Sequence, residues 1–176
     1  FLGQRLDPVF LRFGAAQRVG EAPLVLRQFL FLALQRRDVD ADGDDPAIGR
    51  AAFDDVQKAG SAVANVIGAG IIPAGMEMMD KITIHAVEEF LHAGYDLNAE
   101  AILLCESDGS TEEVADEIRR IYTIMQHSGA TNISTSNNEA ERLKFWAGRK
   151  AAFPAAGRVS PDYYCMDGTI PRKRLA

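Results

Sequence analysis

The sequence predicts a single soluble domain in which α-helices and β-strands alternate along the chain. A length of 176 residues suits one domain with its own core, and hydrophobic and charged fractions of 47% and 25% are those of a globular protein. Short apolar runs, typical of buried strands, are separated by stretches with helical periodicity. This alternation ordinarily favours a parallel sheet, but it also fits a split α+β arrangement. The pattern alone does not separate the two.

Helical periodicity marks four segments, residues 53–67, 81–91, 111–129 and 139–150. The first is expected to begin at Phe53 and to stop at the Gly68/Gly70 pair. In the second, capped by Asp80 and ended by Gly94, five apolar residues are expected to face inward: Ile82, Ile84, Val87, Phe90 and Leu91. Ser110 and Glu113 form a capping box for the third, an amphipathic helix. Asn137 or Asn138 caps the fourth.

The predicted strands are residues 71–79, 101–105, 131–134 and 163–166. Residues 101–105 form a continuous apolar run between turn signals, which indicates a strand buried on both faces. The Asp167–Gly168 pair predicts a turn directly after the last strand. The Pro171–Arg172 pair predicts the start of a further helix.

Charge and cysteine content narrow the class of protein. A net charge of −6 and a pI near 5.1 argue against a nucleic-acid-binding surface, which needs clustered lysine and arginine. Cys105 and Cys165 lie far apart without a CxxC pair, which indicates a reducing, cytoplasmic compartment. The most apolar run, residues 24–34, is interrupted by Arg27 and is far shorter than the ~20 residues that span a bilayer. No signal-peptide pattern opens the sequence.

Residues 1–50 differ in composition from the rest of the chain. They hold seven Arg, no Lys and seven acidic residues, whereas residues 51–176 hold 12 basic and 18 acidic residues and so carry the whole net charge. Our hypothesis is that residues 1–50 are a foreign or misjoined N-terminal segment. The alternative is a helical extension built on residues 24–35. Sequencing the source locus with its upstream reading frame tests both.

Three motifs suggest ligand sites but lack a necessary part. Residues 38–49, DVDADGDDPAIG, begin like an EF-hand calcium loop but place Gly49 where a bidentate glutamate is needed. Residues 66–75, VIGAGIIPAG, place Pro73 at the third glycine of a dinucleotide fingerprint. One predicted helix carries four potential ligands, His85, Glu88, Glu89 and His92, but no further ligand lies nearby in sequence. We therefore predict a solvated acidic turn, a helix stop, a solvated helix face and no metal site.

The segment 142–172, RLKFWAGRKAAFPAAGRVSPDYYCMDGTIPR, is rich in residues that a plain core would not use. Together with AILLCESDG at 101–109 and IIPAGMEMMDKITIHAVEEFLHAGYDLNAE at 71–100, it resembles the C-terminal, substrate-side domain of the FAD-linked oxidases, and within them the FAD subunits of bacterial glycolate oxidases. The likeness covers about 125 of the 176 residues and fades near Ala51. It divides the chain into a non-family segment, 1–50, and a partial family domain, 51–176.

This resemblance implies an α+β fold of the ferredoxin-like type, an antiparallel sheet with helices packed on one face, truncated here at its C-terminal end. It implies a FAD-dependent 2-hydroxy acid oxidoreductase that acts on glycolate or D-lactate. The implied partners are a FAD-binding domain and other glycolate oxidase subunits, an iron–sulfur protein among them, with a cytoplasmic location that is peripheral at the inner membrane through those subunits.

In relatives, later segments of the HAGDGNxHP and GEHGIG kinds supply the ligands for a divalent metal and the acid/base groups. No catalytic residue is therefore expected in this chain, which is expected to be inactive alone and to bind FAD only weakly.

The resemblance also points to particular residues. Flavin-dependent oxidation of a 2-hydroxy acid requires the substrate carboxylate to be pinned, and the arginine fork suits this task. The family's Trp-x-x-Arg pattern matches Trp146 to Arg149, so Arg149 is expected to bind the carboxylate, with Lys150 beside it. Tyr163, Tyr164 and Asp167 lie on the last strand, which in the family runs toward the flavin. Alternate side chains of a strand point to opposite faces, so either Tyr164 or the pair Tyr163 and Asp167 is expected to face the flavin. The alternative function is a stand-alone α+β ligand-binding or regulatory module without catalysis, and a flavin domain encoded in frame upstream would favour the enzyme.

Overall fold

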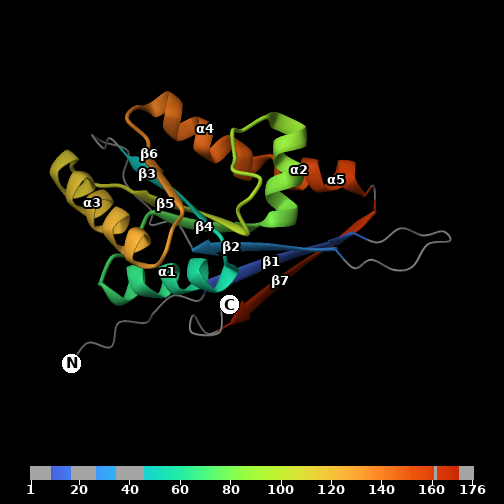
Figure 1. Cartoon of the computed structure of the whole chain (residues 1–176), viewed down its shortest axis with the longest axis horizontal. Helices are drawn as coiled ribbons and strands as arrows, with labels where there is room; N and C mark the ends of the chain where they lie inside the picture. Colours follow the sequence, from blue (N-terminus) through green and yellow to red (C-terminus); the bar gives the residue numbers. More distant parts are fainter. Residues whose placement is uncertain (1–8, 17–26, 35–45, 161, 171–176) are drawn as a thin grey trace.

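The computed structural model describes residues 9–16, 27–34, 46–160 and 162–170, which build one antiparallel sheet flanked by helices (Figure 1). Within these residues seven strands are hydrogen-bonded in the order β6-β3-β5-β4-β2-β1-β7, and every neighbouring pair is antiparallel. The strands are β1 (Val9–Ala16), β2 (Arg27–Leu34), β3 (Ala47–Phe53), β4 (Gly75–Asp80), β5 (Ala101–Ser107), β6 (Asn132–Thr135) and β7 (Tyr163–Ile170).

Four of these strands form a ferredoxin-like core with α1 (Val56–Gly68) and α3 (Thr111–His127). Helix α1 connects β3 to β4, and α3 connects β5 to β6, while the order β6-β3-β5-β4 places one antiparallel strand between the two members of each connected pair. A helical crossover joins strands that run in the same direction, so an interleaved strand makes the whole sheet antiparallel. The predicted α+β class is confirmed.

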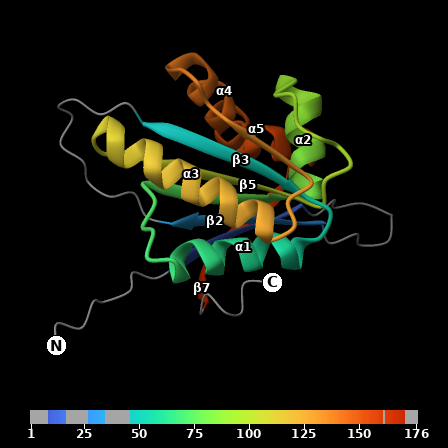
Figure 2. The same ribbon diagram turned by 60° about the vertical axis from the view of Figure 1, so that its left-hand side comes forward.

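Helices α1 and α3 cover one face of this core, where they lie side by side (Figure 2). Their buried residues pack against alternate residues of β5, namely Ala101, Leu103 and Cys105, all 0% exposed. Spacings of three and four residues along each helix, as from Ile121 to Met125, place these side chains on a single stripe. This stripe and the strand face exclude water from one half of the core.

The opposite face of the sheet is covered by α2 (Lys81–Leu91), α4 (Glu139–Lys150) and α5 (Ala152–Val159). Here Ile102 and Leu104, the other alternate residues of β5, pack under Ile84 of α2 and Phe145 of α4. The expectation of helices on one face therefore holds for α1 and α3 but is corrected by this second layer. The reason lies in β5: because both of its faces are apolar, both need a cover.

Side-chain caps fix where the helices begin, as predicted. Asp80 accepts a hydrogen bond from the N–H of Thr83 at 2.9 Å, and Asn138 accepts one from Glu141 at 3.0 Å. Ser110 and Glu113 form the expected capping box, in which the Glu113 carboxylate accepts from the N–H of Ser110 at 3.1 Å.

Replacing Ser110 with alanine is expected to lower the free energy of unfolding by about 1 kcal/mol, because the N–H of Glu113 then loses its capping partner. Urea unfolding measures the change. The matched control is Ser61→Ala on the exposed face of α1, which should stay within about 0.5 kcal/mol of the parent. Equal effects at both positions would contradict the capping argument.

Several predicted boundaries and orientations are corrected. Phe53 ends β3 and does not begin a helix, because Asp55 adopts an extended conformation and caps α1 two residues later. The second helix ends at His92, in the left-handed conformation, before Gly94 is reached. Three of its residues expected to face inward, Ile82, Phe90 and Leu91, are 36% to 42% exposed.

Near the two ends of the described chain, strands replace other expected elements. Asp167 and Gly168 lie inside β7, paired with Arg12 and Leu11 of β1, so they form no turn there. Residues 27–34 form β2, which excludes the helical extension proposed as an alternative for this stretch. Helix α5 was not predicted; its Pro154 lies in the first turn, where the missing N–H breaks no intrahelical bond.

Two predictions fall on residues outside the described ranges, the acidic turn at 38–45 and a helix starting at Pro171–Arg172. Among the helices that the structure describes, none has the length and apolarity to cross a bilayer.

Candidate functional site

Helix α4 presents a stripe of large polar and aromatic side chains to the sheet. Arg142, Trp146 and Arg149 follow one another at intervals of four and three residues, so they share one face of the helix over two turns. Lys150 lies beside the stripe at the C-terminal end. This spacing sets two guanidinium groups roughly 10 Å apart along the helix axis.

Two carboxylates on neighbouring strands face this stripe. In the register of β4 and β5, Gly75 pairs with Glu106 and Glu77 pairs with Leu104. Paired residues of adjacent strands point to the same face of a sheet, and Leu104 belongs to the apolar cluster beneath α2 and α4. Glu77 and Glu106 therefore point toward α4.

Glu106 forms the centre of a hydrogen-bonded network at one end of the stripe. It accepts a hydrogen bond from Nε1 of Trp146 at 2.9 Å and forms an ion pair with Nη1 of Arg142. Arg142 also holds Glu139 through Nε and Nη2, at 2.6 and 2.7 Å. The bonds to Glu139 and then to Glu106 raise the pKa of Arg142 above its ordinary value, so this guanidinium stays charged.

The Trp146 ring packs closely on the glycine at the start of β4. A Cβ on Gly75 would lie 3.3 Å from Cζ2 of Trp146 and 3.4 Å from its Cη2. The first distance is shorter than most Cβ contacts and the second is at the edge of ordinary van der Waals contact, so a side chain at position 75 would press the indole ring away from the strand backbone.

At the other end of the stripe, Nε of Arg149 forms an ion pair with Oε2 of Glu77. The two side chains are 13% and 16% exposed, so both charges are largely shielded from water and stabilise each other. The guanidinium that the sequence assigns to a substrate carboxylate thus already contacts a carboxylate of the protein.

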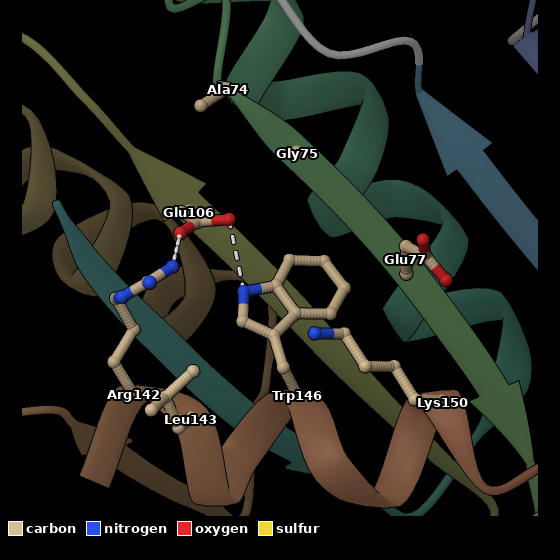
Figure 3. Close-up of a pocket in the computed structure, with 8 residues that line it drawn as sticks. All are labelled: Ala74, Gly75, Glu77, Glu106, Arg142, Leu143, Trp146 and Lys150. Atoms are coloured by element: carbon tan, nitrogen blue, oxygen red, sulfur yellow. Dashed lines mark hydrogen bonds and ion pairs between the residues drawn. The ribbon is translucent and has the colours of Figure 1, made fainter. Parts of the chain in front are cut away.

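A cavity of about 280 Å³ lies between α4 and the adjoining strands β4 and β5 (Figure 3). It is lined by Ala74, Gly75, Glu77, Glu106, Arg142, Leu143, Trp146 and Lys150. Figure 3 shows the Trp146 ring between Glu106 and Arg142 on one side and Glu77 and Lys150 on the other. Lys150 is exposed and forms no ion pair with another described residue. Lys150, and not Arg149, is therefore the residue of the predicted pair that lines the cavity.

Behind the stripe, Tyr95 supports the C-terminal half of α4. It is 6% exposed, and its hydroxyl donates a hydrogen bond to the carbonyl of Phe145 at 3.3 Å. The Arg50 guanidinium lies over both rings, 4.5 Å from the centroid of Phe145 and 5.6 Å from that of Tyr95. Gly148 faces the phenol ring, and its missing side chain makes this approach possible.

Stability is expected to fall at alkaline pH because burial, together with Glu88, raises the pKa of Tyr95 from 10 to about 12, while Arg50 opposes the change. A group with a raised folded-state pKa stabilises the fold fully below its unfolded pKa, here about 10, and loses this contribution as the pH passes 12. The contribution at stake is about 2–3 kcal/mol. Burial also raises the pKa of Cys105, so its thiol acts in the same direction.

Unfolding temperatures of the parent and of Tyr95→Phe, measured from pH 8 to 12, test this expectation. The variant should show a shallower fall above about pH 10, since it has no phenol to ionise. Tyr122→Phe is the control, because Tyr122 is 41% exposed on α3. A profile that Tyr95→Phe leaves unchanged would contradict the assignment.

The other predicted site residues, Tyr163, Tyr164 and Asp167, lie on β7 at the edge of the described sheet. Strands β2 and β1 separate β7 from β4, which carries Glu77. The described part of the chain therefore does not bring these three residues to the cavity at α4. Their assignment to the flavin stays a prediction.

The remaining motifs have local structural roles where the structure describes them. Gly70 adopts a positive φ of 79° after the end of α1, as expected of a helix stop. The ring Nε2 of His85 lies 3.0 Å from the carbonyl of Leu97, and Glu88 accepts from the N–H groups of Gly94 and Tyr95 at 3.2 and 3.0 Å. No group of three or more potential metal ligands gathers among the described residues.

Sequence reasoning missed Glu77, Glu106 and Arg142 as members of the site. A signal for the arginine was present, because Arg142 and Arg149 lie seven residues apart and so repeat on one helix face. The glutamates also stood out as lone charges inside the apolar strands MEMM and LLCES. Pairing them with α4 needs the strand register, which local patterns do not supply.

Comparison with known proteins places this chain in a family. Residues 46–176 match the family model described as FAD linked oxidases, C-terminal domain, so the chain belongs to that family. The match begins five residues before the boundary predicted from the sequence. The predicted resemblance is thereby confirmed.

Curated relatives point to two activities. The chain is 58% identical over 125 residues to the glycolate oxidase subunit GlcD of Escherichia coli strain K12, and 31% identical over 126 residues to GlcD of Bacillus subtilis strain 168. It is 26% identical over 125 residues to a probable mitochondrial D-lactate dehydrogenase of Danio rerio. These alignments cover 71%, 72% and 70% of this chain, which spans only about a quarter of the relatives' length, 25%, 27% and 25%.

Among solved structures, an alkyldihydroxyacetonephosphate synthase aligns with a TM-score of 0.46 and 14% identity, over 67% of this chain and 24% of that one.

Proposed function

We propose that this chain is the substrate-side domain of a FAD-dependent oxidoreductase that oxidises a 2-hydroxy acid, either glycolate or D-lactate. Family membership supports the flavin chemistry, and the names of the relatives supply the two candidate substrates. Because the chain spans about a quarter of those relatives, substrate and activity are transferred to it as a proposal.

The observation that carries the proposal is the pair of cations that ends α4: Lys150 lines a cavity of about 280 Å³, and Arg149 forms an ion pair with Glu77, which also lines it. Removal of a hydride equivalent from the hydroxyl-bearing carbon requires the neighbouring carboxylate to be held in one orientation. We assign this task to Arg149, whose planar fork matches a carboxylate, with Lys150 as a second, mobile point charge. A cavity of this size is large enough to admit a small 2-hydroxy acid.

The acidic caps of three helices disfavour binding of the FAD diphosphate by the described residues. A diphosphate binds where free N–H groups open a helix after a strand. Here α1, α2 and α3 each follow a strand, and their first N–H groups are capped by Asp55, Asp80 and the Ser110–Glu113 box. Carboxylates at these positions repel phosphate. The proposal therefore places FAD on another domain, and this chain's role is to bind and orient the substrate.

Strand β7 is part of the same proposal. It is the outermost strand of the described sheet, an edge that a second domain can reach. We assign β7 to the side of the domain that faces the flavin. Because neighbouring residues of a strand point to opposite faces, either Tyr164 or the pair Tyr163 and Asp167 is directed at it. An iron–sulfur subunit as electron acceptor, a peripheral location at the inner membrane and a divalent metal held by other segments complete the proposal, on the basis of the family resemblance alone.

Anaerobic flavin reduction tests the function. The holoenzyme, meaning the complete protein that carries this chain together with its flavin domain, is purified with FAD and mixed with glycolate or D-lactate without oxygen. Loss of the visible absorbance of oxidised flavin is expected with at least one acid. Flavin that stays oxidised with both acids would refute the activity and leave the non-catalytic ligand-binding module.

A further inference from the structure

The two arginine–glutamate pairs of α4 look alike but have different surroundings. Both join a helix arginine to a strand glutamate, and all four side chains are at most 17% exposed. The arginines lie seven residues apart, and the glutamates occupy neighbouring strands. The two ends of the stripe differ in their local balance of charge and in which arginine lines the cavity.

At the Arg142 end, one cation is paired with two carboxylates. Its guanidinium contacts Glu106 and Glu139, and Glu106 also accepts from Trp146. This end has no excess positive charge to offer an anion, and its bonds fasten the start of α4 to β5.

At the other end, the cations are in excess. Among the residues whose side chains the structure describes there, Arg149 and Lys150 contribute two positive charges and Glu77 contributes one negative charge, a net charge of +1. One further carboxylate neutralises this end, and two would leave it negative. Arg149 and Glu77 are largely shielded from water, and charges in such surroundings interact more strongly than charges in bulk solvent.

Glu77 is also placed to control how Arg149 is presented. It lines the cavity and contacts the guanidinium through Nε. A contact at this nitrogen restrains the plane of the guanidinium, as a second partner does for any side chain that must meet a ligand in one geometry.

We propose that Glu77 is a positioning and specificity-determining residue of this site: it holds Arg149 in place and sets the net charge so that the cavity takes 2-hydroxy acids with one carboxylate and rejects those with two. This inference rests on the proposed function and deepens it. A second carboxylate would meet Glu77 and Glu106, both of which line the cavity. Rejection by like charge is a common way to achieve specificity.

Matched substrates make the test direct. Whichever of glycolate and D-lactate the holoenzyme oxidises is compared with the acid that carries one more carboxylate, tartronate for glycolate and D-malate for D-lactate. The kcat/KM ratio of dicarboxylate to monocarboxylate is measured for the parent and for Glu77→Gln. The variant is expected to raise this ratio by at least about tenfold, because it removes the repelling charge while keeping a similar shape.

Glu139→Gln is the matched control. It removes the same charge from a glutamate that also pairs with an α4 arginine, but Glu139 is 59% exposed and does not line the cavity. The control should leave the ratio unchanged. A ratio that Glu77→Gln leaves unchanged, or that Glu139→Gln raises as much, would overturn the inference, and so would a parent enzyme that accepts both acids equally.

The Glu77→Asp variant distinguishes the effect of the position of the carboxylate from the effect of its charge. It also provides a test if Glu77→Gln does not fold. It keeps the charge but withdraws it by one methylene, so kcat/KM for both acids should fall by about ten- to a hundredfold at a constant ratio. Parent-like kcat/KM in Glu77→Asp would overturn the positioning role. A parent holoenzyme whose flavin is reduced by neither acid would refute the proposed function and this inference together. If the parent oxidises its acid and the Glu77 variants show the same kcat/KM values and the same ratio as the parent, only the inference is refuted.

Discussion

The Gly148→Ala variant should unfold at a markedly lower temperature than the parent, although it adds a single methyl group. An alanine Cβ there would lie 2.5 Å from Cζ and 2.8 Å from Cε2 of Tyr95, far inside carbon–carbon contact distance. Tyr95 is 6% exposed and bonded to the Phe145 carbonyl, so its ring has little room to move. Overpacking of this kind costs about 1–3 kcal/mol. For a protein of this size, each kcal/mol corresponds to a fall of about 2–4 °C in Tm.

Two comparisons isolate the cause. Gly68→Ala introduces the same methyl group at the last residue of α1, where no atom lies within 4 Å, so it should be neutral or stabilise slightly. In a Tyr95→Ala background the Gly148→Ala penalty should vanish, because the colliding ring is gone. A penalty that persists there would show that loss of the glycine backbone, and not the phenol, is responsible.

Local signals in the sequence were sufficient for most helices. The capping box at Ser110, the caps Asp80 and Asn138 and the Gly68/Gly70 stop each depend on residues within one turn of each other. The Phe53 boundary failed for a related reason. Its apolar side chain suits a helix stripe as well as a strand end, and only pairing with Ala101 of β5 decides between them.

Long-range pairing accounts for the larger omissions. The second helical layer is explained by β5, whose unbroken apolar run predicted burial on both faces. The run did not predict which helices cover each face. Likewise, the Arg149 motif was visible in the sequence, but its partner Glu77 lies 72 positions earlier on a strand. Which carboxylate a guanidinium meets is set by the register of strand and helix, and not by its neighbours in sequence.

The Arg149→Ala holoenzyme is expected to lose about ten- to 150-fold in kcat/KM for the oxidised acid. A charge-assisted hydrogen bond between guanidinium and carboxylate is worth roughly 1.5–3 kcal/mol, and this variant removes it. Arg149→Lys should fall between parent and alanine variant, because it keeps the charge without the fork. Arg158→Ala serves as control, since Arg158 lies exposed in the last turn of α5, over the Phe90 ring.

The ion pair with Glu77 adds a second cause that must be separated from the first. Removing the arginine leaves a largely shielded carboxylate beside the cavity, and this charge repels an incoming acid. The double variant Arg149→Ala/Glu77→Gln removes this repulsion and should recover part of kcat/KM, while the missing fork keeps it below the parent. If Arg149→Ala lowers kcat/KM by less than about tenfold, or about 1.4 kcal/mol, but still lowers Tm, then Arg149 has only the structural role of holding α4 on β4.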